Sequence, residues 1–245
     1  MTHPHASPTE FAPGLVLQGI TPPLALKNYK LIAFDMDSTL INIECVDEIA
    51  DMVGCKAEVA AITEAAMQGI ITDFKDSLRR RVALLKGSTI ADLERVYGER
   101  LRINPGAREL VAACRAAGLK TLLVSGGFTF FAHRVRDELG IDFVRANMLE
   151  VRASTNCGEL TGRLVDQAWG DICDGAEKRR TLLEVASLLG LESEQCIAMG
   201  DGANDLPMMH AAGLSVAYHA KPAVRAQAQV AINQGGLDRL LEVLR

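Results

Sequence analysis

The chain has 245 residues, 49% of them hydrophobic, which is enough to bury a full core in one large domain or in one domain with an insertion. Its formal net charge of −5 argues against a basic nucleic-acid-binding face and against a polybasic membrane anchor. The first residues have no signal-peptide pattern and no window reaches the roughly 18 apolar residues of a membrane span, so we expect a cytoplasmic protein. Six scattered cysteines without a Cys-x-x-Cys pair predict small buried side chains rather than a zinc or disulfide framework.

The first half of the chain shows a short strand followed by helices. Residues 1 to about 27 are Pro-rich and weakly patterned, and we expect an N-terminal arm or a short edge element there. A strand is expected over about 29–35, and the stretch from about 43 to 104 contains helix signals only. Its amphipathic segments predict a small helical bundle, with helices over residues 45–53, 57–68, 73–86 and 89–101.

Beyond residue 106, helical and strand patterns alternate, which is typical of a parallel sheet covered by helices on both faces. The expected elements are a helix over 107–117, a strand over 119–124, a helix over 128–139, a hairpin over about 143–165, a helix over 177–189, a strand over 195–199, a helix over about 204–212, a strand over 214–218, a helix, a strand over 229–232 and a last helix. We therefore expect an α/β fold with a three-layer α/β/α Rossmann-like core, formed by residues 28–42 and 106–245. Residues 43–105 are then an inserted four-helix-bundle cap, which begins just beyond the end of the first strand.

Two carboxylates follow the first expected strand at a spacing of two residues. Side chains at i and i+2 of a strand share a face, so Asp35 and Asp37 point the same way at the end where open parallel sheets bind ligands. Two anions this close persist at neutral pH when a cation lies between them or when one keeps a proton. The pattern fits a catalytic pair, and it fits turn carboxylates that cap the next helix equally well.

A second polar motif, Ser125-Gly126-Gly127, follows the apolar run over residues 122–124. A hydroxyl group and unhindered backbone N–H groups between a strand and a helix form an anion cradle, because the first N–H groups of a helix are unpaired. A plain strand-to-helix turn that uses glycine for tight geometry is the alternative.

A third motif, Gly200-Asp201-Gly202-Ala203-Asn204-Asp205, again follows an apolar strand. Its carboxylates are hard oxygen ligands that suit Mg²⁺, and the further ligands of a calcium loop are missing. Lys178, at the start of the preceding helix, could bring a positive charge to a phosphate. Taken by itself, a lysine in a charged helix start is usually solvated.

In this order, the polar motifs resemble the haloacid dehalogenase (HAD) superfamily of phosphatases. The motifs are Asp35-Met36-Asp37-Ser38-Thr39, Ser125-Gly126, Lys178 and Gly200-Asp201-Gly202-Ala203-Asn204-Asp205. The resemblance implies a HAD core with a helical cap, and Mg²⁺ as the cofactor.

Further motifs narrow the resemblance to the phosphoserine phosphatases within that superfamily. These motifs are Glu44-Cys45, Met67-Gln68-Gly69, Phe74, Ser77-Leu78-Arg79-Arg80-Arg81-Val82, Ser125-Gly126-Gly127-Phe128-Thr129 and the stretch 200–208. The resemblance covers about residues 29–232 and implies hydrolysis of O-phospho-L-serine to L-serine and phosphate, the last step of serine biosynthesis. It implies a small phosphomonoester as the ligand, with no nucleic-acid or membrane partner, and leaves a monomer and a homodimer both open.

The resemblance also implies a role for each matching core residue. Asp35 is the expected nucleophile, which forms an aspartyl-phosphate, and Asp37 is the expected general acid and base. The expected metal ligands are Asp35, the backbone carbonyl group of Asp37 and Asp201. The remaining residues are expected to hold the substrate or to order the site: Ser125, the Gly126 N–H and Lys178 on the phosphoryl oxygens, Asn204 on the substrate, and Asp205 beside the metal ligands and Lys178.

Specificity for a phosphorylated amino acid requires an anion for the ammonium group and a fork of donors for the carboxylate. Glu44 and Arg81 fit these needs and match the family's positions, and Met67 and Phe74 are the expected apolar walls. Without the resemblance, the run of three arginines predicts an exposed helical charge at Arg81. We expect Arg79 and Arg80 to be surface residues.

Two other functions use the same residues or the same fold. One is transfer of the phosphoryl group from phosphoserine to another alcohol such as homoserine. The other is a non-catalytic binding or scaffold protein, which is disfavoured because Asp35, Asp37, Lys178 and Asp201 are all present.

Overall fold

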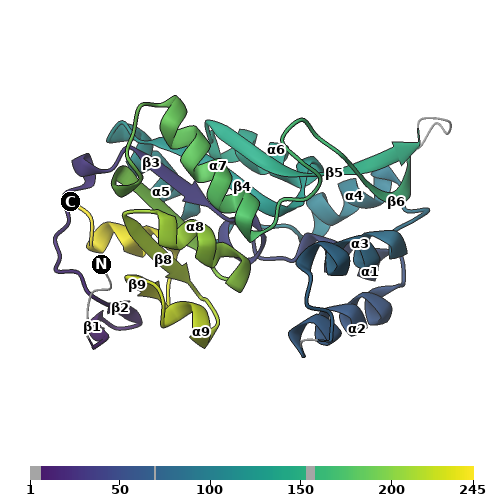
Figure 1. The fold of residues 1–245 in the computed structure, drawn as a ribbon, viewed down its shortest axis with the longest axis horizontal. Helices are drawn as coiled ribbons and strands as arrows, with labels where there is room; N and C mark the ends of the chain where they lie inside the picture. The colour runs from purple at the N-terminus through teal and green to yellow at the C-terminus, as the bar shows by residue number, and fades with distance from the viewer. Residues whose placement is uncertain (1–6, 69, 153–157) are drawn as a thin grey trace.

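The computed structural model of the protein describes residues 7–68, 70–152 and 158–245, and the side chain of Met67 lies outside this description. Within these ranges, nine strands form one sheet in the order β1-β2-β9-β8-β7-β3-β4-β5-β6 (Figure 1). The strands are β1 Thr9–Ala12, β2 Leu15–Leu17, β3 Leu31–Phe34, β4 Lys120–Phe128, β5 Phe143–Arg152, β6 Glu159–Val165, β7 Cys196–Gly200, β8 Leu214–Tyr218 and β9 Val230–Ile232.

The centre of the sheet is parallel and its two edges are antiparallel. The strands from β9 through β8, β7, β3 and β4 to β5 all run parallel to their neighbours, as the alternating pattern predicted. The short N-terminal hairpin adds β2 antiparallel to β9, and the hairpin after β5 adds β6 antiparallel to β5. The β1–β2 and β5–β6 pairs are antiparallel because each is joined by a short connection, whereas a parallel pair requires a long crossover.

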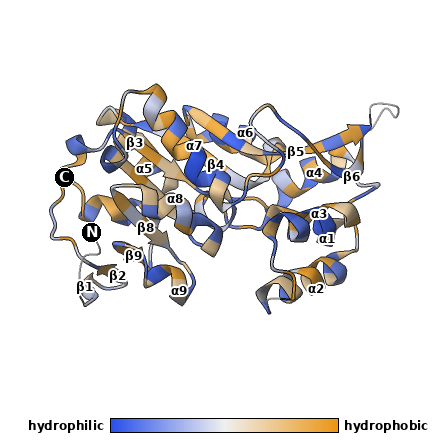
Figure 2. Cartoon of the chain, viewed as in Figure 1, coloured by the Kyte–Doolittle hydropathy of each residue, from blue (hydrophilic) through white to orange (hydrophobic). Residues whose placement is uncertain are grey.

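Strand β3 is buried at every position, and its side chains alternate between two apolar layers. Ile32 and Phe34 belong to the core on one face of the sheet, whereas Leu31 and Ala33 belong to the core on the other face. Figure 2 shows the apolar colouring along β3. A strand that is covered on both faces reads as a continuous apolar run, which is why this element was predictable.

Helices cover both faces of the sheet, which gives three layers. Helices α5 and α6 contribute apolar side chains to one core, and α7 and α8 contribute to the other. The elements outside the sheet in this part of the chain are α5 Ala107–Ala116, α6 Thr129–Leu139, α7 Gly175–Leu188, α8 Leu206–Ala211, α9 Pro222–Arg225 and the 3-10 helices η4 Ser193–Gln195, η5 Ala203–Asp205 and η6 Leu237–Glu242. No helix within the described ranges is long and apolar enough to cross a membrane.

A group of helices lies at one end of the molecule, beside the carboxyl end of β3 (Figure 1). They are α1 Cys45–Met52, α2 Lys56–Met67, α3 Phe74–Leu84 and α4 Ile90–Arg95, followed by the π-helical turn η3 Val96–Arg100. The single helix expected over 89–101 is therefore two elements. Its start was predictable, because Thr89 and Asp92 form a capping box.

The hairpin of β5 and β6 reaches this helical group and bonds to it through the backbone. Leu160 accepts a hydrogen bond from Gly87 N at 3.0 Å and donates one to Ser88 O at 2.7 Å. Ile90 N donates to Gly158 O at 2.9 Å. These bonds anchor the loop between α3 and α4 to the core sheet, and nothing in the local sequence pattern indicated them.

Candidate active site

Polar residues from neighbouring strands converge at one edge of the parallel sheet. Phe34 of β3 lies level with Met199 of β7, and β4 runs parallel on the other side of β3. Asp35 follows β3 directly, Asp201 follows β7 directly, and Ser125 lies in the last part of β4. Because parallel strands end at the same edge, side chains that are far apart in the chain meet there.

Three carboxylates form a tight cluster at this edge. In the part of the chain that the structure describes, oxygen atoms of Asp35, Asp201 and Asp205 all lie within 4.8 Å of one another. Burial and the charge of Asp205 raise the pKa of Asp35 well above its ordinary value. The same two causes raise the pKa of Asp201 to about 7. Such a cluster is stable at neutral pH when it holds a cation or a proton.

Lys178 supplies one positive charge to this cluster. It is fully buried, and its Nζ donates hydrogen bonds of 2.6 Å to Oδ1 of Asp35 and to Oδ1 of Asp205. Burial by itself lowers the pKa of Lys178, but the charges of Asp205 and Asp35 outweigh burial and raise it. The interpretation of Lys178 as a solvated helix-start residue is therefore wrong, because the chain folds α7 over the end of β3.

Asp205 is held by the protein at both carboxylate oxygens. While Oδ1 accepts from Lys178, Oδ2 accepts from the backbone N–H groups of Asp201 at 3.1 Å and of Gly202 at 3.0 Å. Asp205 therefore orders the loop that carries Asp201 and fixes the lysine.

Asp37 lies close to the same edge and is bonded by the start of α1. Its Oδ2 accepts a hydrogen bond from Cys45 N at 3.0 Å, and its Oδ1 accepts one from Cys45 Sγ at 3.2 Å. Burial and the nearby charge of Glu44 raise the pKa of Asp37 to about 7. A carboxyl group with this pKa exchanges a proton readily near neutral pH.

The motif Ser125-Gly126-Gly127 is extended rather than a strand-to-helix turn. Strand β4 continues to Phe128, and α6 begins only at Thr129. Ser125 is fully buried and its Oγ accepts a hydrogen bond from Gly127 N at 2.8 Å. The expected cradle at a helix start is therefore corrected to a strand end, where β4 pairs with β5 at Val124 and again at Phe128 with an irregular register between them.

Gly127 has close neighbours in the site. A Cβ atom at this position would lie 2.9 Å from Met36 Cε and 3.2 Å from Asp37 Oδ1. A side chain at this position would therefore require Met36 and the carboxyl group of Asp37 to shift slightly. The glycine is explained by this close approach, since its φ is not in the left-handed region.

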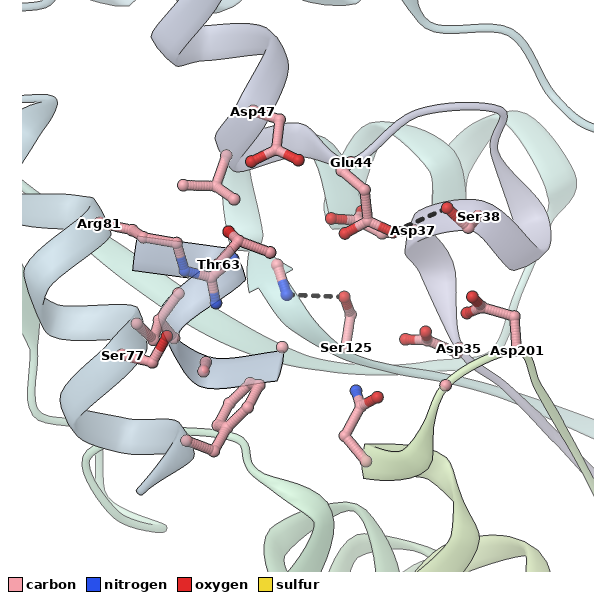
Figure 3. A pocket seen from close by; sticks show the side chains of 18 of the residues that line it. Asp35, Asp37, Ser38, Glu44, Asp47, Thr63, Ser77, Arg81, Ser125 and Asp201 are labelled. Atoms are coloured by element: carbon pink, nitrogen blue, oxygen red, sulfur yellow. Dashed lines mark hydrogen bonds between the residues drawn. The ribbon is translucent and has the colours of Figure 1, made fainter. Parts of the chain in front are cut away.

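A cavity of about 600 Å³ lies between the sheet edge and the helical group (Figure 3). Its wall on the core side includes Asp35, Asp37, Ser125, Gly126, Asp201 and Asn204. Its wall on the helical side includes Glu44, Asp47, Thr63, Phe74, Ser77 and Arg81. Carboxylates thus line both walls of the cavity, and the helical wall also carries an arginine.

The charged groups of the helical wall influence one another. Burial lowers the pKa of Arg81, and the charges of Asp47 and Glu44 oppose this effect. Burial raises the pKa of Glu44, whose Oε1 accepts a hydrogen bond of 2.7 Å from Ser38 Oγ. The buried Nε of Arg81 has no hydrogen-bond partner among the described residues. The guanidinium group therefore retains donor capacity for an anion in the cavity.

Comparison with known proteins is consistent with this geometry. A family model described as haloacid dehalogenase-like hydrolase matches residues 32–210. A phosphoserine phosphatase from Polaromonas sp. strain JS666 is 69% identical over 238 residues, which are 97% of this chain and 99% of that protein. The chain belongs to the haloacid dehalogenase-like hydrolase family.

Solved structures of HAD hydrolases share the fold. A substrate-bound phosphoserine phosphatase complex aligns with a TM-score of 0.79 and 36% identity, over 89% of this chain and 99% of that chain. A phosphoserine phosphatase structure with an analogue of the phospho-aspartyl intermediate aligns with a TM-score of 0.79 and 37% identity, over the same shares of the two chains. Phosphatases of this family depend on a metal, and the acidic cluster offers ligands for one.

The residues expected at the site of this HAD hydrolase fall into three groups, according to whether they line the cavity, lie buried behind it or lie outside the description. Those that line the cavity are Asp35, Asp37, Glu44, Phe74, Arg81, Ser125, Gly126, Asp201 and Asn204. Lys178 and Asp205 are fully buried and bond to the groups that line it. The side chain of Met67, expected as an apolar wall, lies outside the described residues.

Several residues of the cavity wall received no individual role from the sequence, although some of them lie within the quoted motifs. They are Ser38, Val46, Asp47, Thr63, Ala66, Ser77, Leu78, Gly127, Phe128, Gly202, Ala203 and Lys221. Asp47 could have been found, because it lies three residues after Glu44 at the first turn of α1 and therefore on the same side. Thr63 and Lys221 have no local signal, since only the packing of their elements places them at the cavity.

Proposed function

We propose that this chain is a Mg²⁺-dependent phosphoserine phosphatase, which hydrolyses O-phospho-L-serine to L-serine and phosphate as the last step of serine biosynthesis in the cytoplasm. The observation that carries the proposal is the convergence of Asp35, Asp201 and Lys178 beside a cavity with an arginine at its far wall. The 69% identity to a phosphoserine phosphatase over nearly the whole of both chains supports the substrate. In this proposal residues 1–27 are the N-terminal arm, residues 43–105 are the cap, and residues 28–42 and 106–245 are the core.

The acidic cluster fits a divalent cation with hard oxygen ligands. Asp35 and Asp201 are close together, and burial and the charge of Asp205 raise their pKa values. A cation bound between them would reduce the repulsion among these carboxylates. Both oxygens of Asp205 already accept hydrogen bonds from the protein, which favours an ordering role for this residue. Asp35, the backbone carbonyl group of Asp37 and Asp201 are thus the proposed ligands. When bound, Mg²⁺ neutralises part of the phosphate charge and orients the phosphoryl group.

Asp35 is the proposed nucleophile. Lys178 bonds to Oδ1 of Asp35 and holds the carboxylate in a fixed rotamer, and no hydrogen bond within the described ranges reaches its other oxygen. That oxygen forms the new bond to phosphorus while the serine oxygen leaves, which gives an aspartyl-phosphate. Ser125, the N–H of Gly126 and Lys178 are the proposed donors to the phosphoryl oxygens.

Asp37 is the proposed general acid and base. With a pKa of about 7 it carries a proton in a substantial fraction of molecules at neutral pH. It gives this proton to the leaving serine oxygen and afterwards takes one from the water that attacks the aspartyl-phosphate. The raised pKa has a structural cause, since burial and Glu44 both disfavour the anion.

The amino-acid end of the substrate is proposed to lie against the helical wall. Glu44 faces the ammonium group and Arg81 faces the carboxylate, while Phe74 excludes water. Asn204 lies on the cavity wall near the sheet edge and is the proposed further donor to the substrate.

The test is a release assay on purified protein with a panel of phosphomonoesters, with Mg²⁺ and with a chelator. We expect phosphoserine to be preferred, serine and phosphate to appear in equal amounts, and chelator to abolish the reaction. A preferred ester without an amino-acid end would contradict the proposed substrate. A shortfall of free phosphate when homoserine is added would indicate transfer to that alcohol.

A further inference from the structure

One residue holds both oxygens of the Asp37 carboxyl group. Cys45 is the first residue of α1, and its backbone N–H is one of the free donors at the start of that helix. The N–H donates to Oδ2 at 3.0 Å and the thiol donates to Oδ1 at 3.2 Å. Two bonds from one rigid residue to the two ends of a carboxyl group set the rotation of its plane.

Within the described residues, the Cys45 thiol has one hydrogen-bond partner, the Asp37 carboxyl group. The residue is fully buried within the apolar core, and within the described part of the chain its Sγ bonds to no other group. Each carboxyl oxygen has two in-plane positions, so Asp37 can accept both bonds and still carry a proton. The contact therefore restrains the acid without occupying the position that its proton needs.

Strand β4 also approaches the carboxyl group. A Cβ atom on Gly127 would lie only 3.2 Å from Asp37 Oδ1, the oxygen that accepts the thiol hydrogen bond. The Asp37 carboxyl group is thus close to both the end of a core strand and the first turn of α1. Its orientation depends on where α1 is placed.

We propose that Cys45 is a positioning residue, whose thiol hydrogen bond orients the Asp37 carboxyl group for proton transfer to the leaving oxygen. This inference rests on the proposed function, because it takes Asp37 as the general acid. In the first step an Asp35 oxygen bonds to phosphorus, the bond from phosphorus to the ester oxygen breaks, and the Asp37 proton moves to that oxygen. Loss of the thiol bond slows the proton transfer and leaves the attack by Asp35 intact.

The experiment compares esters whose leaving groups differ in their need for a proton. We would measure kcat/KM of the Mg²⁺-loaded protein for phosphoserine, phenyl phosphate and p-nitrophenyl phosphate. The nitrophenolate ion leaves without a proton, whereas the alkoxide of serine requires one. The ratio kcat/KM reports only the steps up to departure of the leaving group, so a slower breakdown of the aspartyl-phosphate does not affect it.

Three variants separate positioning from packing. Cys45→Ala removes the donor, Cys45→Ser keeps a donor of similar size, and Cys114→Ala removes an equally buried thiol of α5 in the same core. For Cys45→Ala we expect kcat/KM to fall about tenfold or more with phosphoserine and to stay within about threefold with p-nitrophenyl phosphate. Phenyl phosphate should lie between them. Cys45→Ser should restore most of the phosphoserine activity, and Cys114→Ala should change the three esters equally.

Each other outcome is informative. Equal losses on all three esters in Cys45→Ala, or no loss on any, overturn the positioning role, and so does a folded Cys45→Ser protein that stays as impaired as Cys45→Ala. Circular dichroism checks, independently of turnover, that each variant has folded. Absence of phosphate release by the unaltered protein from every ester would instead remove the proposed function, and the inference with it.

Discussion

The ammonium group of Lys178 donates a hydrogen bond of 2.6 Å to Oδ1 of Asp35, across a sequence separation of 143 residues. Both side chains are almost fully shielded from solvent, and Lys178 bonds in the same way to Asp205. A buried charge is costly without a partner, so each member of this triad depends on the others. The contact joins α7 to the end of β3 and fixes the rotamer of the proposed nucleophile.

Replacement of this lysine should harm both stability and activity. Lys178→Met leaves the Asp35 and Asp205 carboxylates without their cation, and we expect a loss of about 3 kcal/mol or more in the free energy of unfolding at pH 8. Phosphoserine turnover should fall about 10²-fold or more, because a donor to the phosphoryl group is lost. Chemical denaturation and a phosphate-release assay measure the two effects. The matched control is Lys56→Met, whose surface pair with Asp51 is 3.4 Å long and should matter little to either quantity.

Removal of the nucleophile should abolish turnover and preserve the fold. In Asp35→Asn the amide cannot attack phosphorus, and we expect a loss on the order of 10⁴-fold or more in kcat. Circular dichroism should show the α/β signal of the unaltered protein. Substantial Mg²⁺-dependent activity in carefully purified Asp35→Asn protein would contradict the assignment of Asp35.

Arg81 should affect recognition of the amino-acid end more than the chemistry. Arg81→Ala removes the donor fork at the far wall of the cavity, so kcat/KM for phosphoserine should fall about 10- to 100-fold. For ethyl phosphate, which lacks the amino-acid end, the change should stay below about threefold. The neighbouring exposed residue provides the control: Arg80→Ala should leave both substrates unaffected, since its side chain pairs with Asp76 outside the cavity. Equal losses on the two esters in Arg81→Ala would exclude this role.

The stability of the metal-free protein should depend on pH in a defined direction. Asp37 and Asp201 have folded-state pKa values of about 7, and that of Asp35 is also raised, whereas unfolded aspartates titrate near about pH 4. The folded state therefore binds more protons than the unfolded state between these limits. These carboxyl groups therefore contribute most to the free energy of unfolding below about pH 4 to 5. Their contribution is lost as the pH rises to about 7.

Addition of Mg²⁺ should reverse this trend, because the cation competes with those protons. We expect the rise in Tm on adding Mg²⁺ to chelator-treated protein to be larger at pH 8 than at pH 5.5. The Asp201→Asn substitution removes one proposed ligand, so this variant should show a much smaller rise in Tm on adding Mg²⁺ at pH 8. A Tm increase that is independent of pH in the unaltered protein would show that the cation binds away from this cluster.

The parallel sheet and its polar edge could be predicted because their signals are local. A continuous apolar run such as Leu31–Phe34 marks a strand buried on both faces, and a charged residue directly after it marks the end where ligands bind. The continuation of β4 through 125–128 could not be predicted, since it depends on renewed pairing with β5 at Phe128 after an irregular register. The backbone bonds between Leu160 and the loop before α4 were equally hidden, because they join segments about 70 residues apart.

The amino-acid sequence by itself determined the alternation of strands and helices, the positions of the polar motifs and the membership of this chain in a phosphatase family. These properties follow from side-chain chemistry within short segments, where hydrophobic spacing and motif order act directly. Tertiary structure alone decided that Lys178 is buried, that Asp205 is fully engaged by its neighbours, and that Cys45 contacts Asp37. Such contacts depend on how whole elements pack, and no local pattern encodes the distance between two side chains that meet only when the sheet and its covering helices have assembled.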